Sequence, residues 1–145
     1  MPVSARHLGL SLLLLRLGVG LVMAMWTIDK MINPDHAGAV FSNFYGLEGL
    51  GAGSIVGIGA VQAVVIAAFL VGAYRTVTYG AVLLMHAGST LSSWKQYLAA
   101  FDNLLFFAAW PMLAACVALF LLRSHDRLAS FDAWRLRRAP VVDAS

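Results

Sequence analysis

The sequence predicts an all-α integral membrane protein: a four-transmembrane-helix bundle with both termini in the cytoplasm. Of the 145 residues, 61% are hydrophobic and only 12% are charged, and the mean hydropathy is +0.80. An ordinary soluble domain needs no such composition. A bilayer crossing takes about 20 mostly apolar residues, and four runs qualify, at about residues 8–28, 50–71, 77–98 and 104–122. We therefore expect residues 1–124 to form one transmembrane domain.

The first run differs from a cleaved signal peptide. Arg6 and His7 precede it, as a signal sequence would require, but the apolar stretch exceeds the roughly 7 to 15 residues of a signal core. It also contains Arg16, and no small-residue cleavage site precedes Trp26. We expect it to remain as a membrane helix.

The distribution of basic residues predicts the orientation. Lysine and arginine are favoured on the cytoplasmic side of a membrane. The arginines outside the apolar runs precede the first run or follow the second and fourth, whereas the other two connections hold only Lys30 and Lys95 as basic residues, among several acids. Both termini are therefore expected in the cytoplasm, and the two longer connections are expected to face outward.

Residues 125–145 form a basic cytoplasmic tail. Leu128, Phe131 and Trp134 recur at intervals of three residues, which predicts a short interfacial helix. Attraction of this tail to anionic lipid accounts for the isoelectric point near 9.4. Nucleic acid binding is not needed to explain the charge.

Motifs for metal or cofactor chemistry are missing from the sequence. Cys116 is the single cysteine, so thiol–disulfide exchange is disfavoured and a packing role is expected. There is no HExxH, Walker loop or CxxCH. Heme ligation by His86 is disfavoured because His7 and His125 are cytoplasmic and His36 belongs to an outer loop. We expect no metal site and no covalently bound cofactor.

Glycines at the start of the second run predict helix packing. Gly49, Gly53 and Gly57 recur every four residues, on one helical face, where small residues let a neighbouring helix approach. A phosphate-binding loop is disfavoured because no lysine follows these glycines.

Three polar residues are expected in the middle of the membrane. At about 1.5 Å per residue, Arg16 lies roughly 12 Å into the first run, and Gln62 and His86 lie roughly 20 Å and 16 Å outward from Arg75. One interpretation is a polar clasp in which Arg16 donates to Gln62 and to a backbone carbonyl or Ser11. The other is a cavity for a polar head group such as a quinone, with Arg16 as donor and His86 exchanging a proton.

The outward end of the first run predicts a second polar focus. The segment WTIDKMINPDH places Trp26, Asp29 and Lys30 at the membrane surface. Adjacent Asp29 and Lys30 do not face each other on a helix, so Lys95 and Asp102 are their expected partners. A surface ion network joining the two hairpins is one interpretation; docking of an external protein, or a gate over a cavity, is the other.

Two stretches resemble the DoxX family of four-helix membrane proteins. RLGVGLVMAMWTIDKMINP resembles its opening helix, with a motif similar to G-x-D-K-x-x-x-P that Arg16, Asp29, Lys30 and Pro34 match. VQAVVIAAFLVGAYRTVTYGAVLL resembles its second helix, cytoplasmic turn and third-helix start. The resemblance spans roughly residues 15–122. One departure is Gln62, where the family commonly has a glutamate.

The resemblance implies a small multi-pass subunit of a respiratory or redox-stress complex in the bacterial inner membrane. Members resemble subunits of a thiosulfate:quinone oxidoreductase, so a quinone is the expected ligand, and a larger membrane or periplasm-facing redox protein is expected to supply electrons. A non-catalytic anchor or assembly subunit is the alternative, and a small-molecule carrier ranks last because no helix within the membrane is broken. A homo-oligomer is compatible with the small-residue faces.

Overall fold

The computed structural model describes residues 4–138, and within that range every regular element is helical. Seven α-helices and two 3₁₀ helices follow one another. In chain order they are α1 (Ala5–Ile32), α2 (Pro34–Tyr45), α3 (Ala52–Leu70), α4 (Arg75–Ser92), α5 (Trp94–Leu98), η1 (Ala100–Asp102), η2 (Leu104–Ala108), α6 (Ala109–Leu121) and α7 (Phe131–Arg138).

Three of these helical segments are long and apolar enough to cross a membrane: α1, α3 and the continuous segment Leu104–Leu121. The chain is accordingly a multi-pass membrane protein. Helix α4 has a similar length of 18 residues but is more polar, because it carries Arg75, Tyr79 and His86 among several hydroxyl side chains.

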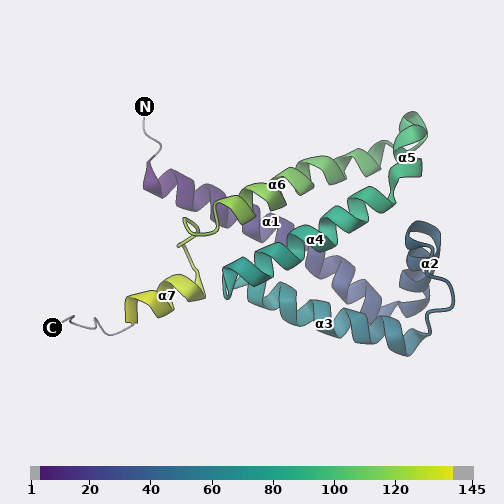
Figure 1. The fold of residues 1–145 in the computed structure, drawn as a ribbon, viewed down its shortest axis with the longest axis horizontal. Coiled ribbons are helices and arrows are strands. Elements are labelled where there is room, and N and C mark those ends of the chain that lie inside the picture. Colours follow the sequence, from purple (N-terminus) through teal and green to yellow (C-terminus); the bar gives the residue numbers. More distant parts are fainter. Residues whose placement is uncertain (1–3, 139–145) are drawn as a thin grey trace.

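The helices pack as two pairs that diverge toward one end (Figure 1). Helix α1 packs most extensively against α3, and α4 against α6. The amino-terminal part of α1, the α3–α4 turn and α7 gather at one end, and α2 and α5 lie at the other. The core between the pairs contains Leu12, Phe69 and Tyr79, and Cys116 packs there as a buried small residue.

The third apolar run is shorter than the expected helix over 77–98. Helix α4 ends at Ser92, and a separate short helix, α5, follows Ser93. The hydroxyls of Ser92 and Ser93 both donate to the carbonyl of Ser89, at 2.9 and 3.2 Å. Such side-chain bonds to the preceding turn compete with helical backbone bonds, which explains the break.

The other three runs agree with the expected helices to within a few residues. Helix α1 extends beyond residues 8–28 at both ends, and α3 covers most of 50–71. The run over 104–122 begins with the 3₁₀ turn η2 before α6. Proline is tolerated only in the first turn of an α-helix, consistent with Pro111 as the third residue of α6.

Helix α2 was not expected from hydropathy. Pro34 occupies its first turn, and Gly46 ends it with a left-handed φ of 65°. Proline at the start and glycine just past the end are ordinary helix boundaries. The loop between the first two membrane runs is therefore largely helical.

Within the described chain, Gly49, Gly53 and Gly57 do not make the close helix contact that their spacing predicts. Gly49 lies in the turn before α3, and a Cβ atom on Gly53 or Gly57 would meet nothing within 4 Å. Gly59 makes the close contact instead, since its Cβ would lie 3.0 Å from Cγ of Met31 on α1. Residues 57 and 59 are two apart and so lie on opposite sides of the helix.

Candidate functional site

Arg16 is held in a buried polar cluster between α1, α4 and the segment after α6. Its side chain has no exposed surface, and Nη1 lies 3.3 Å from a carboxylate oxygen of Asp126, which is equally buried. Nη1 also donates to the hydroxyl of Tyr79 at 3.3 Å, and that hydroxyl donates to Asp126 at 2.7 Å. Nη2 donates to the carbonyls of Leu128 and Ala129, at 2.7 and 3.0 Å. Asp126 thus neutralises the charge of Arg16, and Arg16 connects α1 to α4 and to the segment after α6.

The polar clasp around Arg16 has other partners than those predicted from the sequence, and it lies at another level of the bundle. Arg16 pairs with Asp126 rather than with Gln62 or Ser11, because the segment after α6 folds back over the end of the bundle. Its Nη1 also lies against Gly72 in the α3–α4 turn, where a side chain would clash with it. The guanidinium of Arg16 therefore lies at the level of that turn, not midway along α3. Counting residues from Leu8 gave a different depth for Arg16, because it left out the segment after α6, which folds back onto the bundle.

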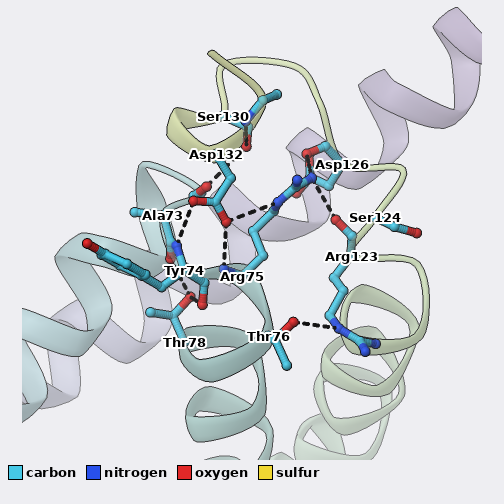
Figure 2. Close-up of polar contacts among 12 residues, drawn as sticks. Ala73, Tyr74, Arg75, Thr76, Thr78, Arg123, Ser124, Asp126, Ser130 and Asp132 are labelled. Carbon is cyan, nitrogen blue, oxygen red and sulfur yellow. Dashed lines mark hydrogen bonds and ion pairs between the residues drawn. The ribbon is translucent and has the colours of Figure 1, made fainter. Parts of the chain in front are cut away.

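A second polar cluster fastens α7 to the start of α4 (Figure 2). The carboxylate of Asp132 accepts the backbone N–H groups of Tyr74 and Arg75, at 3.0 and 2.9 Å, and lies 3.4 Å from Nε of Arg75. Nη1 of Arg75 donates to the carbonyls of Arg123 and Asp126, at 2.8 and 2.6 Å. Helix starts leave N–H groups without partners, so Asp132 caps α4 from a different helix.

The environment of Asp132 favours its charged form. Burial would raise the pKa of this carboxyl, but the hydrogen bonds from the backbone of Arg75 and Tyr74 and the charge of Arg75 together lower the pKa below its ordinary value of 3.8. The cap therefore remains ionised at neutral pH.

A cavity of about 530 Å³, here called the outer pocket, lies between α1, α2, α3 and α4 at the end opposite α7. Its walls are largely apolar and aromatic: Met23, Trp26, Val40, Phe41, Phe44, Tyr45, Ile58, Leu84, Met85 and Phe106. Its polar lining residues are Thr27, Asp29, Lys30, His36, Gln62, Ser89, Ser92 and Ser93.

Gln62, a polar side chain of this pocket, has only a weak protein partner. Its Nε2 lies 3.5 Å from the sulfur of Met85, and a thioether is a poor hydrogen-bond acceptor. The amide therefore gains a stronger hydrogen bond when a better acceptor, such as a carbonyl oxygen, enters the pocket.

The rim of the outer pocket is built by α1 and α2. Asp29 pairs with Nδ1 of His36 at 2.7 Å and accepts the side-chain amide of Asn33 at 3.1 Å. Nζ of Lys30 donates to the carbonyl of Trp26 at 3.1 Å. The contact between Asp29 and His36 connects α1 to α2.

The expected network linking Asp29 and Lys30 to Lys95 and Asp102 does not form. Among the described residues, Asp29 pairs with His36, and no ion pair includes Lys30, Lys95 or Asp102. Nζ of Lys95 instead lies 5.8 Å from the ring centre of Trp94. Helix α2 covers the end of α1 and supplies the nearer partner, a helix that hydropathy did not predict.

A second cavity of about 680 Å³, here called the lateral groove, lies between α1, α4 and the η2–α6 segment. It shares Trp26, Ser89, Ser93 and Phe106 with the outer pocket, so these residues form the partition between the two cavities. His86 lines the groove and is 1% exposed. Its Nε2 lies 3.0 Å from the carbonyl oxygen of Ala109, and its Nδ1 has no partner.

The structure therefore separates the three residues expected to share a site. Gln62 lines the outer pocket, His86 lines the lateral groove, and Arg16 lines neither. The aromatic side chains that α2 contributes to the pocket were missed, although Pro34 and Gly46 signal that helix in the sequence. In the described part of the chain, no group of three or more His, Cys, Asp or Glu residues could hold a metal ion.

Comparisons with protein-family models, with curated proteins and with solved structures each find no match to this chain.

Proposed function

We propose that the chain is a small DoxX-like subunit of a redox complex in the bacterial inner membrane, and that it binds a quinone in the outer pocket. The observation that carries this proposal is the pocket itself: an apolar, aromatic cavity with a weakly engaged amide donor, Gln62, on its wall.

The size and lining of the outer pocket fit this class of ligand. Small-molecule sites generally have volumes of roughly 300 to 1,000 Å³ and are mostly apolar with a few polar groups that set orientation. The volume of about 530 Å³ lies within that range. Phe41, Phe44 and Phe106 offer ring surfaces to the flat, conjugated ring of a quinone, because the faces of aromatic side chains stack favourably on flat π systems.

The polar groups suit a ligand with carbonyl oxygens. A quinone oxygen accepts hydrogen bonds and donates none. The Gln62 amide is a donor whose present partner is a thioether, so a carbonyl oxygen is the stronger acceptor of the two.

In the proposed topology α4 also crosses the membrane, as the third of four crossings in chain order. It packs along α6 and connects the end bearing α7 to the end bearing α5. The positive-inside rule then places Arg75, Arg123 and α7 in the cytoplasm. The outer pocket would open near the periplasmic surface, where a soluble or membrane-bound redox partner could supply electrons.

Binding of decylubiquinone to protein in lipid nanodiscs tests the proposal, with empty nanodiscs to subtract partitioning into lipid. We expect saturable binding that weakens about tenfold in Gln62→Leu, the loss of one hydrogen bond to the ligand. Val61→Leu is the matched control, because Val61 is 68% exposed on the same helix and lines neither cavity. Binding no greater than in empty nanodiscs would refute the proposal.

A second candidate function is a non-catalytic anchor subunit, favoured by the open glycine face of α3. A side chain on Gly53 or Gly57 would meet nothing within 4 Å, so another membrane helix could approach closely there. This function predicts that Gly57→Leu abolishes co-purification of a larger subunit from native membranes and leaves quinone binding unchanged. Retained co-purification would count against this role.

A further inference from the structure

The hydrogen on the His86 ring can be located from its contacts. Nε2 lies 3.0 Å from the carbonyl oxygen of Ala109, and a carbonyl oxygen only accepts hydrogen bonds. Nε2 must therefore carry the hydrogen and donate it across from α4 to α6. In the neutral ring, Nδ1 then keeps its lone pair and is an acceptor.

This acceptor has no donor among the residues that the structure describes. Nδ1 is buried without a hydrogen-bond partner, although buried polar atoms in proteins are nearly always paired. The adjacent Thr90 hydroxyl is not available, because it donates to the backbone carbonyl of His86 at 2.8 Å. The partner that His86 lacks is thus a hydrogen-bond donor.

The lateral groove restricts what that donor can be. His86 lines the groove, and the other described residues around it include no charged side chain. Trp26, whose ring centre lies 6.0 Å from that of His86, and Phe106 give the groove aromatic surfaces. An occupant with one hydroxyl on a largely apolar, aromatic body satisfies both the walls and the free acceptor.

We propose that the lateral groove is a second ligand site, for a lipid-soluble phenol whose hydroxyl donates a hydrogen bond to Nδ1 of His86. Nδ1 itself has almost no exposed surface, so binding requires the side chains that cover this atom to move. The inference rests on His86 and this groove, so it stands apart from quinone binding in the outer pocket. The two cavities differ in chemistry: Gln62 offers a donor to a carbonyl oxygen, and His86 offers an acceptor to a hydroxyl. A lipid acyl chain has no hydrogen-bond donor and would leave Nδ1 unpaired.

Nitrogen-15 NMR of histidine-labelled protein in nanodiscs tests this directly. The chain has four histidines, and the His86 signals are those that disappear in His86→Gln. We expect free protein to show hydrogen on Nε2 and none on Nδ1. Adding 4-nonylphenol should move the Nδ1 signal in a saturable manner, whereas its methyl ether, which lacks the hydroxyl hydrogen, should leave that signal in place.

A binding measurement with the same two probes gives the second readout. We expect the phenol to bind about tenfold more tightly than the ether, a difference of one hydrogen bond. His86→Gln should remove this difference, because a glutamine amide can still donate to Ala109 but offers no acceptor at the position of Nδ1. Val77→Leu, at a residue that is 70% exposed on α4 and outside both cavities, should preserve it.

Three results would overturn the inference: hydrogen on Nδ1 in the free protein, an equal response to phenol and ether, or no response to either. The last result would also fit a tightly held water molecule as the donor. Decylubiquinone binding in the same nanodiscs separates the two proposals. If decylubiquinone binds but the His86 signals do not respond to the phenol, the groove site is refuted and the outer pocket is retained.

Discussion

The guanidinium of Arg16 lies 3.3 Å from the carboxylate of Asp126, and neither side chain has any exposed surface. This pair joins the first helix to the segment that follows the last apolar run, and the Tyr79 hydroxyl bridges both groups. Moving two charges out of water is costly unless each is paired and hydrogen-bonded. Most polar atoms of Arg16 and Asp126 have such hydrogen-bond or ion-pair partners. The pair also holds the segment after α6 over one end of the bundle.

Breaking this pair from one side should strongly destabilise the protein. Arg16→Met and Asp126→Leu are each expected to lower the free energy of unfolding by about 3 to 5 kcal/mol, since each leaves an unpaired buried charge. The double variant should recover most of that loss. Unfolding in mild detergent measures all three variants, and additive losses in the double variant would show that the two residues do not interact.

The Asp132 cap should make the docking of α7 sensitive to acid. Because folding lowers the pKa of this carboxyl below 3.8, its contribution is complete above that value and is lost as the pH falls through the lower, folded-state pKa. Asp132→Asn should weaken the cap at neutral pH by about 1 kcal/mol, because the two oxygens of Asp132 accept from Tyr74 and Arg75 and an amide keeps only one acceptor oxygen. Hydrogen exchange at the amides of Tyr74 and Arg75 should then be about fivefold faster, relative to intrinsic rates.

Asp35→Asn is the control for that experiment, because Asp35 is exposed in the first turn of α2, away from α7. It should leave exchange at Tyr74 and Arg75 unchanged. Equal exchange in Asp132→Asn and the unmodified protein would mean that the carboxylate does not cap α4.

Glycine substitutions should distinguish the packed face of α3 from its open face. Gly59→Leu should cost at least about 1 to 3 kcal/mol, because even a Cβ there would lie 3.0 Å from Met31 and 3.2 Å from Lys30. Gly57→Leu should be neutral or slightly stabilising, since leucine is the better helix former and the site is open. Thermal unfolding compares them, and equal losses would contradict the assigned helix face.

Hydropathy and spacing predicted the helical class and four apolar runs, because those depend on composition and local periodicity. Three of the four runs contain helical segments long and apolar enough to cross a membrane. Hydropathy and spacing also indicated a short helix after residue 125, and α7 occupies Phe131–Arg138. The part of the tail beyond residue 138 lies outside the described residues. The end of α4 before Ser93 could have been predicted from the sequence, because four hydroxyl residues cluster there: Ser89, Thr90, Ser92 and Ser93.

The candidate site was harder to predict because it depends on contacts between distant segments. Depth counting placed Arg16, Gln62 and His86 together, but it could not show that residues 122–130 fold back and bring Asp126 to Arg16. Nor could it predict that α2 would cover the pocket beside Gln62. Both errors came from treating the connections as passive loops.

Photo-crosslinking with an azidoquinone, followed by peptide mass spectrometry, locates the quinone in the structure. We expect labelling in nanodiscs to concentrate on outer-pocket residues such as Phe41, Gln62 and Met85, and excess decylubiquinone to suppress it. Labelling spread over lipid-facing residues such as Val61 and Leu121, and unchanged by the competitor, would contradict quinone binding in the outer pocket.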